Sequence, residues 1–179
     1  FPFADYSYLF THAPNAHWGL EHPSSTMISL GESVYIDAAA RNAGVRVCAH
    51  ELFHAWNVCR MKPEALARPD FAEPPVIDTL WIAEGFTRYY EFLLGTRAKE
   101  LAPEQFFSNV LNYHRHLAAM PAAARVSALD SSRASFLNHN RYPGSINASI
   151  DYYDAGMLIA FELDAKLRLA GEALDGRFA

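Results

Sequence analysis

The stretch His50-Glu51-Leu52-Phe53-His54 determines how the rest of this sequence is interpreted. Residues four apart on a helix share a face, so two imidazoles at this spacing can bind one metal ion. At about 100° per residue, His50, Glu51 and His54 fall within one arc, and mainly apolar residues occupy the opposite side. Two structural histidines would explain the spacing but not the carboxylate on the same arc. The pattern therefore favours a hydrolytic metal site on a helix anchored by its apolar face.

Two imidazoles leave a zinc ion one protein ligand short, because hydrolytic zinc sites usually combine three protein ligands with a water. Glu84 is the best candidate for the third ligand, since it is the one acid in the apolar and aromatic stretch 80–90. The alternative is an exposed helix charge. Trp81 and Phe86 count against that alternative because large aromatic neighbours imply burial. We expect His50, His54 and Glu84 to bind Zn²⁺.

Composition limits the remaining possibilities. The chain has 179 residues, 51% of them apolar, and a formal net charge of −5. This composition fits a folded domain, and the absence of a Lys/Arg cluster makes nucleic acid an unexpected partner. Charged residues interrupt every apolar stretch well before the roughly 18 to 20 residues that a membrane span needs. The compartment, whether cytoplasmic, periplasmic or secreted, and the oligomeric state stay open.

The residue pattern changes along the chain from β to α. Short aromatic and β-branched runs broken by Pro and Gly predict strands within residues 1–37. Helical periodicity predicts helices near 45–58, 77–97, 103–119 and 152–170. Residues 120–149 are expected to be irregular, either as a wall of a binding site or as a surface loop. The predicted fold class is α+β.

The sequence resembles the glycyl aminopeptidase family of zinc metallopeptidases, thermolysin-like gluzincins whose full-length members often carry a PDZ module. Four blocks carry the resemblance, namely Gly19-Leu20-Glu21-His22 with Ser25, His50 to Pro63, Trp81 to Tyr90, and Ile150 to Gly156. The resemblance implies one thermolysin-like zincin catalytic domain over residues 1–179. It also implies a fragment of a longer chain, whose N-terminal β domain and possible C-terminal PDZ module lie outside these residues.

The resemblance also implies roles for individual side chains. Glu51 would act as the general base that takes a proton from a metal-activated water. Tyr153 would donate a hydrogen bond to the tetrahedral intermediate, with Tyr152 as the neighbour that could replace it in this role. Gly19, Leu20 and Glu21 would bind the substrate, Glu21 by pairing with its α-ammonium. From the residues alone, Glu21 could equally cap a turn or pair with an Arg.

These roles predict a zinc-dependent aminopeptidase acting on peptides with a free N-terminus and a small first residue, Gly or Ala. One alternative is a zinc endopeptidase that ignores the free amine. Another is a catalytically impaired peptide-binding scaffold. Two departures from the family pattern motivate the scaffold: Ala155 stands where a Lys is usual, and Trp18 stands where a second Gly often precedes Gly19.

Overall fold

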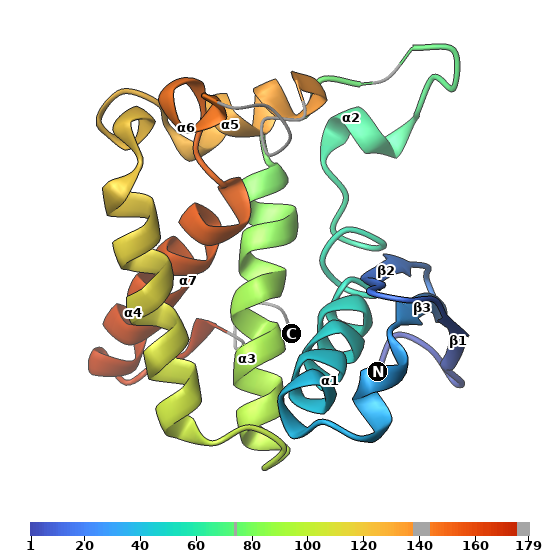
Figure 1. Ribbon diagram of the computed structural model, residues 1–179. Helices are drawn as coiled ribbons and strands as arrows, with labels where there is room; N and C mark the ends of the chain where they lie inside the picture. The colour runs from blue at the N-terminus through green and yellow to red at the C-terminus, as the bar shows by residue number, and fades with distance from the viewer. Residues whose placement is uncertain (74, 138–143, 175–179) are drawn as a thin grey trace. The chain divides into compact units, whose positions relative to one another are not determined.

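The computed structural model describes residues 1–73, 75–137 and 144–174 (Figure 1). Its contacts gather into two compact units, one formed by Phe1–Pro75 with Tyr90–Ser108 and the other by Val76–Tyr89 with Asn109–Ala179. Residues 81–97 form one uninterrupted helix that contributes to both units. The predicted candidate residues on the His50 helix belong to the first unit, and Glu84 and Tyr153 belong to the second.

Three short strands precede a series of helices. In chain order the elements are β1 (Ser7–His12), β2 (His17–Glu21), β3 (Ser25–Leu30), η1 (Glu32–Tyr35), α1 (Ala38–Phe53), α2 (Glu64–Ala67), η2 (Trp81–Phe86), α3 (Thr87–Arg97), α4 (Pro103–Ala119), η3 (Pro121–Ala124), α5 (Ala128–Arg133), η4 (Ala134–Leu137), α6 (Ser145–Ala148) and α7 (Tyr152–Leu169). A small N-terminal sheet followed by a mainly helical portion confirms the predicted α+β class.

The sheet has the order β1-β3-β2, with β3 parallel to β1 and antiparallel to β2. Central strand β3 buries Thr26, Ile28 and Leu30, and α1 packs against β2 and β3. In the part of the chain that the structure describes, β2 is an edge strand. Because successive side chains alternate between faces, His17, Gly19 and Glu21 lie on one face of β2.

Helix α1 begins seven residues before the predicted start at 45 and ends at Phe53 instead of 58. Asp37 caps its first turn, because the Ala40 N–H donates to Asp37 Oδ1 at 2.7 Å. The three alanines that follow the cap extend the helix, which the sequence interpretation missed. The ring of Phe53 stacks on Tyr90 of α3, with centroids 4.1 Å apart, and this contact anchors the end of α1 in the core of the first unit.

The other predicted helices lie close to their expected positions. The helix predicted at 103–119 matches α4, and the one at 152–170 matches α7 to within one residue. The helix predicted at 77–97 begins at Trp81, and its first six residues form a π-helical turn. The described part of 120–149 differs from the irregular segment expected, since it forms short helices; Ser127 and Asp130 make a capping box at α5. Residues 138–143 lie outside the described part.

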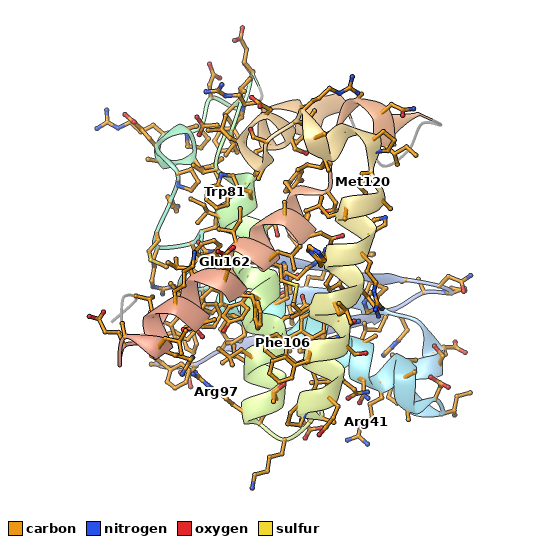
Figure 2. The ribbon with its side chains drawn as sticks, turned by 90° about the vertical axis from the view of Figure 1, so that its left-hand side faces the viewer. Arg41, Trp81, Arg97, Phe106, Met120 and Glu162 are labelled. Atoms are coloured by element: carbon orange, nitrogen blue, oxygen red, sulfur yellow. The ribbon has the colours of Figure 1, made fainter. Side chains whose placement is uncertain are left out.

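In the second unit α7 packs against η2, the helix turn that begins at Trp81 (Figure 2). The two backbones meet at a pair of glycines. A Cβ on Gly85 would overlap the backbone of Gly156, and a Cβ on Gly156 would overlap the Trp81 carbonyl group. The neighbouring α7 residues Met157 and Ala160 are fully buried. The two glycines therefore set how closely the beginning of α7 approaches the helix turn that carries Glu84.

Asp164 fixes the other end of α7. Its buried carboxylate accepts hydrogen bonds from the Tyr89 hydroxyl at 2.5 Å, from Arg168 Nε at 2.7 Å and from the Leu174 N–H at 2.7 Å. Burial acts to raise the pKa of Asp164, but these hydrogen bonds outweigh it and hold the pKa below its ordinary value. The ionised carboxylate therefore stabilises the second unit.

We expect Asp164→Asn to lower the free energy of unfolding by about 3 kcal/mol at pH 7, because a carboxylate with three donors is lost. A lowered pKa gives stability that is present above the ordinary carboxyl pKa of about 3.9 and is lost as the pH falls toward the folded-state value. The difference between variant and wild type should therefore shrink below about pH 4. Urea denaturation at pH 7 and below about pH 4 measures the free energy of unfolding of variant and wild type. Glu162→Gln, at an exposed position of α7, is the matched control. A difference that stays constant with pH would contradict the assignment.

Candidate functional site

His50 of α1 and His54, the C-cap residue of this helix, meet on one face of it, as their spacing predicts. Their Nε2 atoms lie 3.1 Å apart, and His54 is 2% exposed. Two imidazole ligands on a tetrahedral zinc ion, each with a bond of about 2.0–2.1 Å, hold their nitrogen atoms about 3.3 Å apart. The observed separation is therefore close to that of a metal-binding pair.

The Nδ1 atoms determine which nitrogens face each other. His54 Nδ1 lies 2.8 Å from the Asn57 carbonyl oxygen, and His50 Nδ1 lies 2.9 Å from Glu91 Oε2. A carbonyl oxygen or an ionised carboxylate only accepts, so each Nδ1 carries the proton and each neutral ring has its lone pair at Nε2. Two lone pairs at this distance repel unless a proton or a cation lies between them. The chemistry of this pair fits a divalent metal ion.

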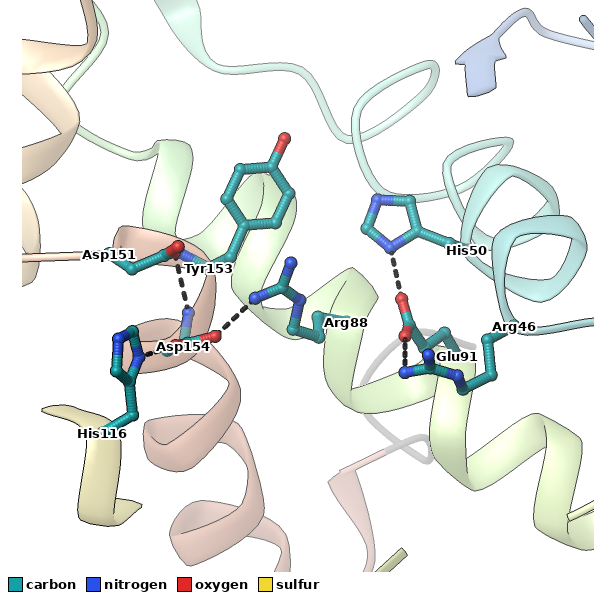
Figure 3. Close-up of polar contacts among 8 residues, drawn as sticks. All are labelled: Arg46, His50, Arg88, Glu91, His116, Asp151, Tyr153 and Asp154. Carbon is teal, nitrogen blue, oxygen red and sulfur yellow. Dashed lines mark hydrogen bonds and ion pairs between the residues drawn. The ribbon is translucent and has the colours of Figure 1, made fainter. Parts of the chain in front are cut away.

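The sequence analysis missed the residues that orient His50. Arg46 donates to Glu91 Oε1 at 3.3 Å, and Glu91 Oε2 accepts from His50 (Figure 3). The Arg46 guanidinium also lies 4.8 Å from the centre of the Phe92 ring, which fixes its position further. Spacing carried a signal for both residues: Arg46 lies four residues before His50 on α1, and Glu91 lies seven residues after Glu84 on one helix.

The turn that follows α1 orients His54. Asn57 supplies the carbonyl oxygen for the imidazole, and Val58 has a φ of 115°, a backbone conformation that is strained for a β-branched residue. Arg60 holds the turn in place, since its guanidinium donates to the Pro23 carbonyl oxygen at 2.9 Å and also to that of Ala55. Arg60, a basic residue in the block from His50 to Pro63, therefore helps to orient the His54 imidazole.

Glu51 lies against strand β2. The Glu51 side chain is buried, and a Cβ on Gly19 would overlap its carboxyl group. Ligand atoms of Glu21, Glu51 and His54 all lie within 4.8 Å of one another. The first unit thus brings together the predicted base, one predicted metal ligand and two of the three predicted substrate-binding residues.

The third of these residues, Leu20, lies on the other face of β2 together with Trp18. Strand alternation directs both side chains away from the face of Gly19, and they are 49% and 46% exposed. Leu20 offers the site its backbone and not its side chain. The Trp18 side chain therefore does not cover the surface beside Glu51, although the family pattern often has Gly at this position.

In the second unit Tyr153 and Glu84 are in contact. The Tyr153 hydroxyl donates a hydrogen bond to the Glu84 carboxylate. Burial raises the pKa of Tyr153 well above its ordinary value, and the charge of Glu84 raises it further. Burial first, then the charge of Glu84, also raises the pKa of the neighbouring Tyr152, to about 12. Tyr153 is therefore a protonated hydrogen-bond donor throughout the neutral range.

Arg88 supplies a cation beside Tyr153. Its guanidinium lies 4.7 Å from the centre of the Tyr153 ring and donates to Asp154 Oδ1 at 2.5 Å, while His116 Nδ1 lies 3.1 Å from Asp154 Oδ2 (Figure 3). Ala155, where the family pattern has Lys, is buried in an apolar cluster with Ala122 and Ile150. The cation beside the Tyr153 ring is thus Arg88 of α3, and position 155 is apolar.

The first unit combines a small sheet packed on a helix with a His-Glu-x-x-His turn. Residues 43–159 match the M61 glycyl aminopeptidase family, and the chain belongs to that family. This result confirms the resemblance to the glycyl aminopeptidase family. The chain is similar to the crystal structure of an aminopeptidase N family protein from Idiomarina loihiensis, with a TM-score of 0.86 and 26% sequence identity.

That similarity covers 97% of this chain and 31% of the Idiomarina protein, so the chain spans about a third of the length of that relative. No curated protein sequence matches the chain. Within the described residues, no helix is both long enough and apolar enough to cross a membrane.

We expect Glu91→Gln to weaken zinc binding by about tenfold or more, because an amide orients His50 without the charge that makes the imidazole a better ligand. Competition with a chelator of known affinity measures the zinc dissociation constant. Glu100→Gln, an exposed change just after the same helix, should leave it unchanged. Equal affinities for the two variants in folded protein would refute the orienting role of Glu91.

Proposed function

We propose that this chain carries the catalytic site of a zinc-dependent aminopeptidase that removes a small N-terminal residue, Gly or Ala, from peptides. The observation that carries the proposal is the pair of facing Nε2 atoms on His50 and His54, with the buried Glu51 carboxylate on the same helix. Membership in the glycyl aminopeptidase family supports both the reaction and the preference for a small first residue.

His50, His54 and Glu84 are the residues that we propose to hold the ion, since hydrolytic zinc sites usually combine three protein ligands with a water. The spacing of Glu84 and Glu91 supports this choice. Seven residues apart on an uninterrupted helix, they share a face, and Glu91 is the residue that accepts from His50. When bound, zinc supplies a water of lowered pKa and polarises the scissile carbonyl group.

Glu51 is the proposed general base. Its carboxylate takes the proton of the attacking water and then returns it to the departing amine, so no covalent intermediate is needed. Gly19 allows this carboxylate to lie close to the edge strand, where an extended peptide can pair with the backbone of β2, including Leu20. The buried position of Glu51 also limits the competing solvation of its charge.

Two further side chains complete the proposed mechanism. Tyr153 stays protonated in the neutral range, and in the proposed mechanism its one O–H turns from Glu84 to the oxygen that becomes negative in the tetrahedral intermediate. Glu21, whose carboxylate lies within 4.8 Å of ligand atoms of Glu51 and His54, pairs with the α-ammonium of the substrate. Binding the α-ammonium at this position places the first peptide bond of the substrate at the attacking water. This requirement distinguishes an aminopeptidase from an endopeptidase.

Two departures from the family pattern, at Ala155 and Trp18, motivated the scaffold alternative, and neither of them favours it over an enzyme. Arg88 lies beside Tyr153 where the Lys at position 155 is missing, and Trp18 points away from Gly19. The endopeptidase alternative uses the same metal and base, so substrates with and without a free amine distinguish it.

We expect Glu51→Gln to lower kcat/KM on a glycyl peptide by about a thousandfold, because the amide cannot accept the proton, while zinc content stays unchanged. Hydrolysis assays combined with elemental analysis measure both quantities. Glu162→Gln, at an exposed position, should keep full activity. If Glu51→Gln retains wild-type turnover, Glu51 is not the base.

A second experiment compares a peptide with a free N-terminus and its N-acetylated form. We expect acetylation to lower kcat/KM by about a hundredfold or more, since the partner of Glu21 is removed. Glu21→Gln should mainly raise KM for the free peptide and leave the acetylated peptide unaffected. Equal rates on both peptides would replace the aminopeptidase proposal with the endopeptidase.

A further inference from the structure

Strand β2 runs beside α1 in a fixed register. Gly19 lies against Glu51, and Glu21 lies near His54. At the other end of the strand, His17 lines a cavity together with Ala40 and Ala43 of α1. The face of β2 that carries Glu21, Gly19 and His17 therefore follows α1 from His54 back toward Arg46.

A cavity of about 480 Å³ lies at the His17 end of this face. Its apolar lining includes Pro14, Ala16, Val34, Ala40 and Ala43, and Glu32, Ser33 and His17 add polar groups. The two alanines lie one turn apart on α1 and contribute little side-chain volume. Ala43 lies one turn before Arg46, so the cavity continues the same side of the helix that carries His50.

The direction of a bound peptide follows from the proposed function, on which this inference rests. If Glu21 holds the α-ammonium and the carbonyl group beside Glu51 is attacked, the residues after the scissile bond extend away from Glu21, toward His17. Gly19 and His17 are two residues apart, or about 7 Å along an extended strand. An extended substrate covers that distance in two residues, so its third residue reaches the cavity.

We propose that the cavity beside His17 is the subsite for the third residue of the peptide substrate, and that it takes an apolar side chain such as leucine. Its apolar lining favours such a side chain, and its continuity with the face of β2 that carries Glu21 and Gly19 makes a substrate peptide the occupant. The subsite would make the enzyme prefer peptides of three or more residues over dipeptides.

The test compares kcat/KM for Gly-Ala-Leu, Gly-Ala-Gly and Gly-Ala, in wild type and in Ala43→Phe. We expect the wild type to prefer Gly-Ala-Leu over Gly-Ala-Gly by about tenfold, the size of effect that an apolar pocket supplies. Ala43→Phe fills the cavity and should abolish this preference while leaving Gly-Ala hydrolysis unchanged. Ala40→Phe fills it from one turn earlier and gives a second variant if the first does not fold.

Ala39→Phe is the matched control, because Ala39 is an exposed residue of the same helix that does not line the cavity. It should keep the preference for leucine. Equal wild-type rates on Gly-Ala-Leu and Gly-Ala-Gly would overturn the subsite while leaving the aminopeptidase proposal intact. Retention of the preference in both cavity-filling variants would also overturn it. Failure to cleave any of the three peptides would instead overturn the proposed function, and the subsite with it.

Discussion

Two imidazoles face each other with their Nε2 lone pairs because each Nδ1 is bonded to a group that can only accept. For His54 the acceptor is the Asn57 carbonyl oxygen in the turn after α1, and for His50 it is Glu91, itself held by Arg46. Without these partners either ring could rotate or exchange tautomers, and the metal-type site would be lost. Val58, with its positive φ, and Arg60, which donates to the Pro23 carbonyl oxygen, lie in the turn that carries the Asn57 carbonyl group and fix its conformation.

The register of β2 against α1 determines which side chains lie beside His50 and His54. One face of the strand carries an acid, a glycine and a histidine in succession, and each lies beside a different part of α1. Glycine in the middle position is needed because the Glu51 carboxylate occupies the space of a Cβ. A strand of five residues therefore positions the base and orders the surface on either side of it.

In the second unit, too, glycine lets two segments of the chain approach each other closely. Gly85 and Gly156 let α7 contact the helix turn that carries Glu84, and this contact lets Tyr153 donate to that carboxylate. Arg88 then binds Asp154 and lies beside the Tyr153 ring. The cation beside Tyr153 therefore comes from a residue distant in sequence and not from position 155.

The sequence by itself determined the features that depend on local periodicity: the α+β order, the positions of α4 and α7, the shared face of His50 and His54, and the family to which the chain belongs. The start of α1 was missed although Asp37 and the alanines after it carried a local signal. Only tertiary structure decided which group orients the His50 ring, because Glu91, 41 residues further along the chain, is brought to His50 by packing between α1 and α3. It also decided that Tyr153 bonds Glu84, that Trp18 points away from Gly19, and that a cavity lies beside His17. These properties depend on contacts between distant segments, and spacing along a single chain does not encode such contacts in a form that one sequence can reveal.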